Sequence, residues 1–255
     1  MNILLTNDDG FQAAGLLELY KILKLNHSVC VVAPEIEHSG KSHAMTLRYP
    51  LLLRKHDTLF YSCSGTPVDC VLLVYHKAIP FEPDIVISGI NRGPNLGTDI
   101  IYSGTAAAAR QSAMVGVPGV AVSLAEFTEP FYYTALAQYI CKNIHIFKEL
   151  WEPGMFFNVN APNADPHHQY TAQWTGLCKR VYKDKMEAVH TKGGTSYCFY
   201  TEGNITTIED CDSDEYAVSN GKLSITPIEI TPTLAHQWLQ KHQICPRSTV
   251  RDCND

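Results

Sequence analysis

Short apolar runs rich in β-branched residues alternate with amphipathic helical stretches from Asn2 to about Leu124. This rhythm is typical of a parallel sheet whose strands are joined by crossover helices. It therefore predicts an α/β fold for the first half of the chain. The expected strands cover residues 3–5, 29–32, 85–87 and 117–122, and the expected helices cover residues 14–25, 68–75 and 105–114.

An inserted hairpin interrupts this pattern, and further helices and strands follow it. Residues 46–53 and 59–62 predict an extra hairpin between βα units. A helix over 130–147 and a closing strand over 155–159 should complete the core, after which the sequence becomes aromatic and punctuated by glycine. The later elements are expected as strands at 170–174, 196–201 and 223–230 and a terminal helix at 232–243, with Leu234, Trp238 and Leu239 on one side.

We thus expect one domain, with a core formed by residues 1–162 and a smaller β-rich part formed by residues 163–255. The length of 255 residues is enough for a sizeable core of this kind. A formal net charge of −6 and the lack of any Lys/Arg run argue against polymeric nucleic acid and against a membrane surface. No apolar run reaches the roughly 20 residues that span a bilayer, and the first residues do not resemble a signal peptide. These features predict a cytoplasmic location.

The nine cysteines are an odd number, are scattered along the chain and form no Cys-x-x-Cys pair. Neither a disulfide framework nor a zinc knuckle is therefore predicted. Most cysteines are expected to be reduced, with several filling the core.

Polar residues follow the predicted strands at the edge where parallel α/β sheets bind ligands. Asp8 and Asp9 come directly after the first strand. Two adjacent carboxylates repel each other unless a cation or a set of donors neutralises them, and a metal ion is the simplest resolution. A polar turn with a helix cap remains the alternative for this motif.

Three more segments have residues suited to binding an anion. Residues 88–99 combine neutral oxygen ligands with glycines that let backbone N–H groups approach an anion, which predicts a phosphate loop or an ordinary surface loop. Ser103 to Thr105 precede a predicted helix, whose N-terminus favours phosphate, although a plain cap would have the same residues. Ser39 and Gly40 could offer a hydroxyl to a metal ion and a backbone N–H group to a phosphate, although Ser-Gly pairs are also common in linkers with no chemical role. The sequence has neither a Walker motif nor a dinucleotide fingerprint, which counts against ATP and NAD.

Taken together, these motifs closely resemble those of the SurE family of 5′-nucleotidases. The matching segments occur in the expected order over nearly the whole chain, and only residues 176–220 match loosely. They are Thr-Asn-Asp-Asp-Gly at 6–10, Val-Ala-Pro at 32–34, Ser-Gly at 39–40, Gly-Thr-Pro-Val-Asp-Cys at 65–70, Ser-Gly-Ile-Asn-Arg-Gly at 88–93, Asn-Leu-Gly at 95–97, Tyr-Ser-Gly-Thr at 102–105, Asn-Val-Asn-Ala-Pro at 158–162 and Ser-Ile-Thr-Pro at 224–227.

The resemblance implies a three-layer α/β/α, Rossmann-like fold with a mostly parallel sheet, a smaller β-rich C-terminal subdomain and a terminal helix. It implies one divalent cation, Mg²⁺ or Mn²⁺, because every ligand is a hard oxygen. The implied metal ligands are Asp8, Asp9, Ser39 and Asn91, of which Asp8 and Asp9 are also the implied catalytic residues. The implied phosphate site consists of Gly40, Asn95, Ser103, Gly104 and Thr105.

The activity implied by the resemblance is hydrolysis of a nucleoside 5′- or 3′-monophosphate, with wider activity on short polyphosphate. The nucleophile is expected to be a water activated by the metal or oriented by Asp8 or Asp9, and an aspartyl phosphate on Asp8 is the alternative. A general phosphomonoesterase and a non-catalytic nucleotide- or phosphate-binding module are the competing hypotheses. Relatives form dimers or tetramers that exchange their C-terminal part, so a homodimer or homotetramer is expected, in which Trp238 packs on a partner or on its own chain.

Overall fold

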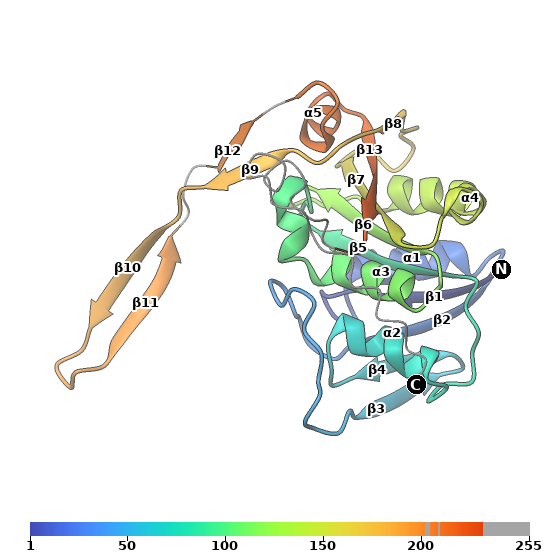
Figure 1. Ribbon diagram of the computed structural model, residues 1–255, viewed down its shortest axis with the longest axis horizontal. Coiled ribbons are helices and arrows are strands. Elements are labelled where there is room, and N and C mark those ends of the chain that lie inside the picture. The colour runs from blue at the N-terminus through green and yellow to red at the C-terminus, as the bar shows by residue number, and fades with distance from the viewer. Residues whose placement is uncertain (202–204, 209, 232–255) are drawn as a thin grey trace, which may run out of the picture.

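The computed structural model describes residues 1–201, 205–208 and 210–231. Its centre is a nine-stranded, mostly parallel sheet with the strand order β3-β4-β2-β1-β5-β6-β7-β13-β8 (Figure 1). The strands of this sheet are β1 (Asn2–Thr6), β2 (Ser28–Pro34), β3 (Leu53–Asp57), β4 (Phe60–Cys63), β5 (Ile85–Arg92), β6 (Gly119–Ala125), β7 (Met155–Pro162), β8 (Ala172–Trp174) and β13 (Leu223–Glu229).

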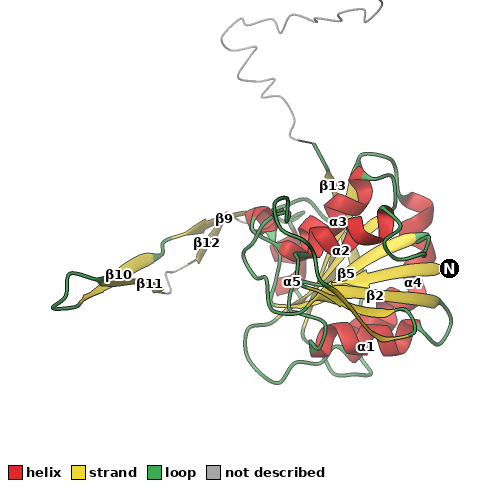
Figure 2. Cartoon of the chain, turned by 90° about the horizontal axis from the view of Figure 1, so that it is seen from below, coloured by secondary structure: helices red, strands yellow, loops and turns green. Residues whose placement is uncertain are grey.

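Helices cover both faces of the sheet, so that the fold has three layers (Figure 2). The helix pair α1 and α4 lies on one face, and the pair α2 and α3 lies on the other. A short 3₁₀-helix, η1, precedes α3. The helices are α1 (Ala14–Leu23), α2 (Pro67–Tyr75), η1 (Gly97–Ile101), α3 (Gly104–Met114), α4 (Thr134–Leu150) and α5 (Asp214–Ser219).

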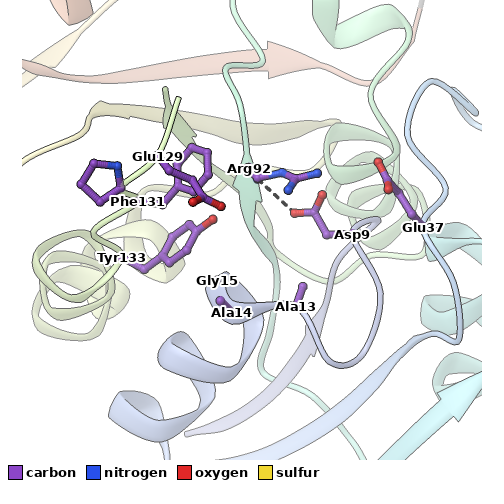
Figure 3. Close-up of a pocket in the computed structure, with 10 residues that line it drawn as sticks. Asp9, Ala13, Ala14, Gly15, Glu37, Arg92, Glu129, Phe131 and Tyr133 are labelled. Atoms are coloured by element: carbon purple, nitrogen blue, oxygen red, sulfur yellow. Dashed lines mark hydrogen bonds between the residues drawn. The ribbon is translucent and has the colours of Figure 1, made fainter. Parts of the chain in front are cut away.

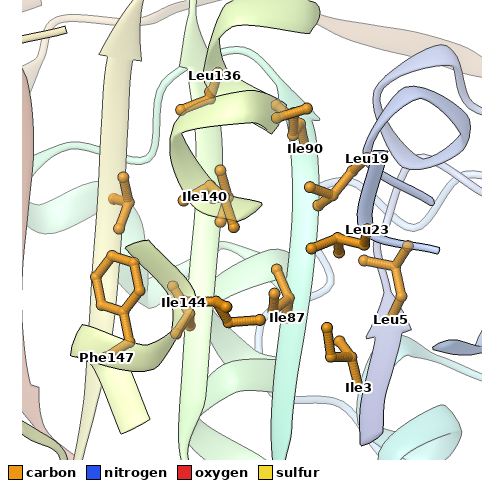
Figure 4. Packing of buried hydrophobic residues seen from close by; sticks show 14 of the residues in the cluster. Ile3, Leu5, Leu19, Leu23, Ile87, Ile90, Leu136, Ile140, Ile144 and Phe147 are labelled. Carbon is orange, nitrogen blue, oxygen red and sulfur yellow. The ribbon is translucent and has the colours of Figure 1, made fainter. Parts of the chain in front are cut away.

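The central strands are apolar throughout because both of their faces are buried. Successive side chains of a strand point to opposite faces, so Ile3 and Leu5 pack toward α1 and α4 while Leu4 packs toward α2 and α3. The α1/α4 side of the core is shown in Figure 4, where Leu19 and Leu23 of α1 lie over β1 and β5. This packing fixes the carboxyl ends of β1 and β5 side by side, as their parallel register from Ile3↔Ile85 to Thr6↔Ser88 requires.

Beyond β7 the sheet continues with strands from the later part of the chain. β13 pairs antiparallel with β7, and β8 pairs parallel with β13. The predicted strands at 170–174 and 223–230 thus lie in the central sheet. The boundary near residue 162 stays a prediction.

Four further strands form an arm that projects from the body of the molecule (Figure 1). We call the strands β9 to β12 the arm. β9 pairs antiparallel with β12, and β10 pairs antiparallel with β11. Their bounds are β9 (Lys179–Tyr182), β10 (Lys185–His190), β11 (Ser196–Thr201) and β12 (Ile205–Ile208).

The structure corrects the predicted hairpin. Its first strand is β3, and residues 46–52 form no strand. The hydrogen bonds of Thr46 and the chemistry of Pro50 explain the difference. The backbone N–H and hydroxyl of Thr46 both donate to the Asp69 carboxylate, and Pro50 has no N–H group for a ladder.

The structure also corrects the start of the predicted helix at 130–147, because α4 begins at Thr134. The residues before it are held against another loop. Asn163 accepts a hydrogen bond from the N–H of Tyr132 and donates to the carbonyl oxygen of Pro130. These two hydrogen bonds hold residues 130–132 in a non-helical conformation, so α4 begins only at Thr134.

The predicted terminal helix, with Leu234, Trp238 and Leu239, lies outside the described residues. In the part of the chain that is described, every cysteine is unpaired, and Cys30, Cys63, Cys70 and Cys178 are buried, which confirms that several cysteines fill the core. Within residues 1–201, 205–208 and 210–231, no helix combines the length and apolarity needed to cross a bilayer.

Candidate metal and phosphate site

Asp8 leaves the end of β1 and enters the interior beside the start of α3. Its side chain is only 4% exposed. The hydroxyl of Thr105 donates to Asp8 Oδ1. Burial raises the pKa of Asp8, and the Thr105 hydroxyl and the backbone N–H groups at the start of α3 oppose this rise without cancelling it. These donors neutralise only part of the charge on the buried carboxylate. A cation on its other side would balance the rest.

Gly104 allows this close approach. A Cβ atom at position 104 would lie 2.8 Å from Asp8 Cβ and 2.9 Å from Asp8 Oδ2, which is closer than non-bonded atoms come. Any residue other than glycine would therefore displace either the carboxylate or the first turn of α3.

The side chain of Asp9 is half-buried and reaches toward the end of β5. Its Oδ2 accepts the backbone N–H of Arg92 at 3.0 Å, which joins the end of β1 to the end of β5. Burial, followed by repulsion from the neighbouring Asp8, raises the pKa of Asp9 to about 6. Two adjacent carboxylates with raised pKa values form a site in which a cation is favourable.

The raised pKa of Asp9 predicts how the stability of metal-free protein depends on pH. Folding strengthens proton binding to Asp9, so its ionisation destabilises the fold progressively as the pH rises from about 4 through 6. We expect Asp9→Asn to raise the free energy of unfolding of EDTA-treated protein at pH 8 by about 1–2 kcal/mol, a figure reduced for partial exposure. This gain should vanish at pH 4, where wild-type Asp9 is protonated.

Thermal melts of both proteins at pH 4 and pH 8 measure this effect, with the exposed Asp184→Asn variant as the control. An Asp9→Asn variant that melts below the wild type at pH 8 would contradict the assignment of a destabilising carboxylate at this position.

Ser39 and Asn91 present oxygen atoms with free lone pairs to the same region. The Ser39 hydroxyl donates to Glu37 Oε1 at 2.7 Å, which turns its proton away and leaves the oxygen able to bind a cation. Asn91 Nδ2 donates to the carbonyl oxygen of Gly93 at 3.0 Å, which fixes the amide so that Oδ1 is the free atom. Both side chains therefore fit the predicted role of metal ligands.

One cavity, of about 300 Å³, gathers most of the predicted site residues, and we call it the Asp8 cavity. Asp8, Ser39 and Asn91 lie on its wall together with Gly40, Asn95 and Ser103. These residues lie at or after the ends of β1, β2 and β5 and directly before α3. Hard oxygen ligands and hydrogen-bond donors thus share one space.

Ser103 caps α3 while keeping a donor for a ligand. Its Oγ accepts the N–H of Ala106 at 3.0 Å, and its hydroxyl proton is left over. The hydroxyl of Thr105 is instead bonded to Asp8, so a contact from Thr105 to a phosphate would have to use its backbone N–H. The positive end of the α3 dipole lies in the same region.

Asn95 is held rigidly by a group of buried amides. Its N–H donates to Asn160 Oδ1 at 2.9 Å, and its carbonyl oxygen accepts from Asn158 and Asn160. Its own Nδ2 donates to Ser123 Oγ at 2.8 Å and has a second hydrogen available. A sequence signal for this group exists, because β7 is an apolar strand with asparagines at two alternate positions. No role was predicted for them.

A second cavity, of about 530 Å³, lies at Asp9, and we call it the Asp9 cavity (Figure 3). Its charged residues are the three carboxylates Asp9, Glu37 and Glu129 and the guanidinium of Arg92. Asp9 lines this cavity and is not among the residues that line the Asp8 cavity, although it is next to Asp8 in the chain.

Neither His38 nor His43 lines the Asp8 cavity. His43 Nε2 is hydrogen-bonded to Gln111 Oε1 at 2.9 Å. Burial lowers the pKa of His38, whose two ring nitrogens have no partner among the described residues.

Several side chains of the Asp8 cavity were not foreseen. Tyr102, Phe127, Tyr182 and Ile205 lie on its wall. The first was part of a quoted motif but was given no role, and the other three come from a loop after β6 and from the arm. No local spacing signals that these segments meet.

The layers and the site define a class: an α/β protein with an acidic ligand site and a helix N-terminus at the carboxyl edge of a parallel sheet. The family model for Survival protein SurE matches residues 3–184. The chain belongs to that family, which confirms the resemblance noted from its motifs.

Known relatives match the chain over most of its length. A protein named 5′-nucleotidase SurE from Thermosipho melanesiensis is 42% identical over 236 residues, covering 90% of this chain and 92% of that one. A protein of the same name from Desulfitobacterium hafniense is 41% identical over 232 residues, covering 89% and 90%. The crystal structure of the SurE protein from Aquifex aeolicus superimposes with a TM-score of 0.79 at 33% identity, covering 94% of this chain and 98% of that one. The predicted α/β fold is confirmed.

Proposed function

We propose that this protein is a 5′-nucleotidase that hydrolyses nucleoside monophosphates to nucleoside and phosphate with the help of one divalent cation, Mg²⁺ or Mn²⁺. The names of the similar relatives support the reaction. The observation that carries the proposal is the Asp8 cavity, where the buried carboxylate of Asp8 lies with Ser39 and Asn91 and with the donors at the start of α3.

The four oxygen side chains Asp8, Asp9, Ser39 and Asn91 would hold the cation. Bound there, it would supply positive charge for the phosphoryl oxygens and lower the pKa of a water molecule. The fit rests on the buried charge of Asp8 and on the free oxygen atoms of Ser39 and Asn91.

The phosphate would be bound by Gly40, Asn95, Ser103, Gly104 and Thr105. The free proton of the Ser103 hydroxyl and the free hydrogen of the Asn95 amide support this role, since a phosphate oxygen accepts both. The rigid hold on Asn95 matters because fixed donors stabilise developing charge without having to reorganise during the reaction. These groups bind and orient the phosphate.

A water nucleophile fits the carboxylates better than an aspartyl phosphate on Asp8. Asp8 is buried, is bonded to Thr105 and packs on Gly104, so its oxygens have little freedom to attack phosphorus. Asp9 is half-buried and borders a cavity, where it is able to orient a water molecule and accept its proton.

The remaining parts of the proposal are finer. We propose activity on 3′-monophosphates and short polyphosphate beside 5′-monophosphates, a cytoplasmic location, and assembly into a homodimer or homotetramer. We keep the division into a core of residues 1–162 and a smaller part after it.

Phosphate release from AMP by EDTA-treated protein, with and without added Mn²⁺ or Mg²⁺, tests the proposal. We expect turnover only with metal, and a higher kcat/KM for AMP than for p-nitrophenyl phosphate. Equal values for the two substrates would indicate a general phosphomonoesterase. No release with either metal, from protein with a normal melting transition, would leave a binding module as the function.

A further inference from the structure

The Asp8 cavity has a polar part and an apolar part. The predicted metal and phosphate residues form the polar part. The apolar part is formed by Tyr102 after η1, Phe127 after β6, and the arm residues Tyr182 and Ile205. A ligand that fills both parts must have a charged group and a flat or apolar group.

Phe127 and Tyr102 are unusually exposed for aromatic side chains on the wall of one cavity. Their exposed fractions are 71% and 61%, and neither ring is stacked on another ring in the described part of the chain. Most of the surface of each ring is therefore open to a ligand. A single exposed aromatic residue is ordinary, but two at the rim of a polar cavity indicate a binding surface.

The backbone around Phe127 is ordered although its ring is exposed. Glu126 Oε1 accepts the N–H groups of Phe127 at 2.8 Å and of Thr128 at 2.9 Å. The ring lies over Gly93, where an added Cβ atom would be 3.7 Å from it. Phe127 is thus held close to the loop that follows β5, the strand that contains Asn91.

Tyr102 and the arm are fixed from the other side. The carbonyl oxygen of Tyr102 accepts the N–H of Ser42 at 2.9 Å. Tyr182 and Ile205 are direct partners in the ladder between β9 and β12, so they present one continuous surface. Arg180 anchors this part of the arm through a 2.5 Å ion pair with Asp99 in η1.

We propose that this apolar part is the nucleobase subsite, in which Phe127 and Tyr102 stack on the base while Tyr182 and Ile205 form its wall. The inference rests on the proposed nucleotidase function and adds which residues recognise the nucleoside. Stacking uses the π-face that every base has, so it favours nucleotides over other phosphate esters with little preference among bases. A volume of about 300 Å³ lies at the small end of known ligand sites, which suits a mononucleotide.

The Asp9 cavity is less suited to a base. Its aromatic residues Phe131 and Tyr133 are stacked on each other at 6.3 Å, and both pack against the core. One face of each ring is thus covered by the other ring. The rest of the lining is divided equally between four charged residues and four small residues or proline, none of which offers an aromatic face.

The experiment compares two substrates that differ only in the base. AMP and ribose 5-phosphate carry the same phosphate and sugar, so an effect confined to AMP reports on the base. For Phe127→Ala we expect kcat/KM for AMP to fall about 10- to 100-fold, while kcat/KM for ribose 5-phosphate changes less than twofold. Phe127→Trp should restore the preference for AMP. Tyr49→Ala, at another exposed aromatic residue, is the control.

The outcomes separate this inference from the proposed function. If wild-type protein hydrolyses neither substrate with metal, the proposed function fails and the subsite fails with it. If wild-type protein hydrolyses AMP no better than ribose 5-phosphate, or if Phe127→Ala lowers both rates equally, the activity stands and the subsite is overturned. A change in elution volume of Phe127→Ala on size-exclusion chromatography, with equal loss on both substrates, would likewise overturn it.

Discussion

Asp8→Asn should lower kcat/KM for AMP by at least about a thousandfold while leaving the fold intact. The substitution keeps the size of the side chain and an oxygen that accepts the Thr105 hydroxyl, but it removes the buried charge on which the proposed cation site depends. Because burial disfavours the ionised form of Asp8, the neutral amide should not lower the melting temperature of metal-free protein. A large loss of activity without a loss of stability is therefore the expected signature.

Phosphate release with saturating Mn²⁺, beside a thermal melt, measures both effects. Asp165→Asn, which replaces an exposed carboxylate, is the control and should leave kcat/KM unchanged. Wild-type activity in Asp8→Asn would sink the assignment of the site. Should Asp8→Asn fail to fold, Asp8→Glu provides the second test, since its carboxylate is displaced by one methylene group and should also lose most activity.

Gly104→Ala should be the most damaging small substitution near the site. The added methyl group would lie 2.8 Å from Asp8 Cβ, so either the carboxylate or the first turn of α3 must shift. Overpacking of this kind costs about 1–3 kcal/mol, and a displacement of about 1 Å in a catalytic group can lower kcat about a hundredfold. We expect a melting temperature lower by several degrees together with a large loss of turnover.

Gly193→Ala is the matched control for this substitution. A Cβ atom at Gly193 would meet no atom within 4 Å, so the same change should leave stability and activity close to those of the wild type. A Gly104→Ala variant with normal turnover would show that the contact between Asp8 and α3 does not set the geometry of the reaction.

The elements that sequence reasoning found are those whose patterns depend on burial alone. β1 and β2 are apolar at nearly every position because helices cover both faces of the sheet. β3 escaped notice because Leu-Arg-Lys-His-Asp is polar, as exposed edge strands often are. The start of α4 was misplaced because a contact with Asn163, about thirty residues away, holds the preceding residues.

The parts of the candidate site that lie at the carboxyl ends of strands were predictable from the sequence. The positions of Asp8 and Asn91 at the ends of β1 and β5 bring them to one edge of the sheet, as the parallel pattern implies. The apolar part of the cavity could not be inferred in this way. Tyr182 of the arm and Phe127 of the loop after β6 both line it although they are far apart in the chain, and no period in the sequence encodes that approach.

Long-range hydrogen bonds connect the loop after β5 to the later part of the chain. Asp214 is fully buried and accepts the N–H of Gly97, 117 residues away in the chain, as well as that of Cys178. The bond to Gly97 closes a loop of 117 residues, so it forms only in a chain that includes Asp214. The position of Gly97, two residues after Asn95, is therefore fixed only when the chain up to α5 has folded. Specific activity per molecule thus serves as a count of fully assembled chains, and a nascent or truncated chain that ends before α5 should contribute nothing to it.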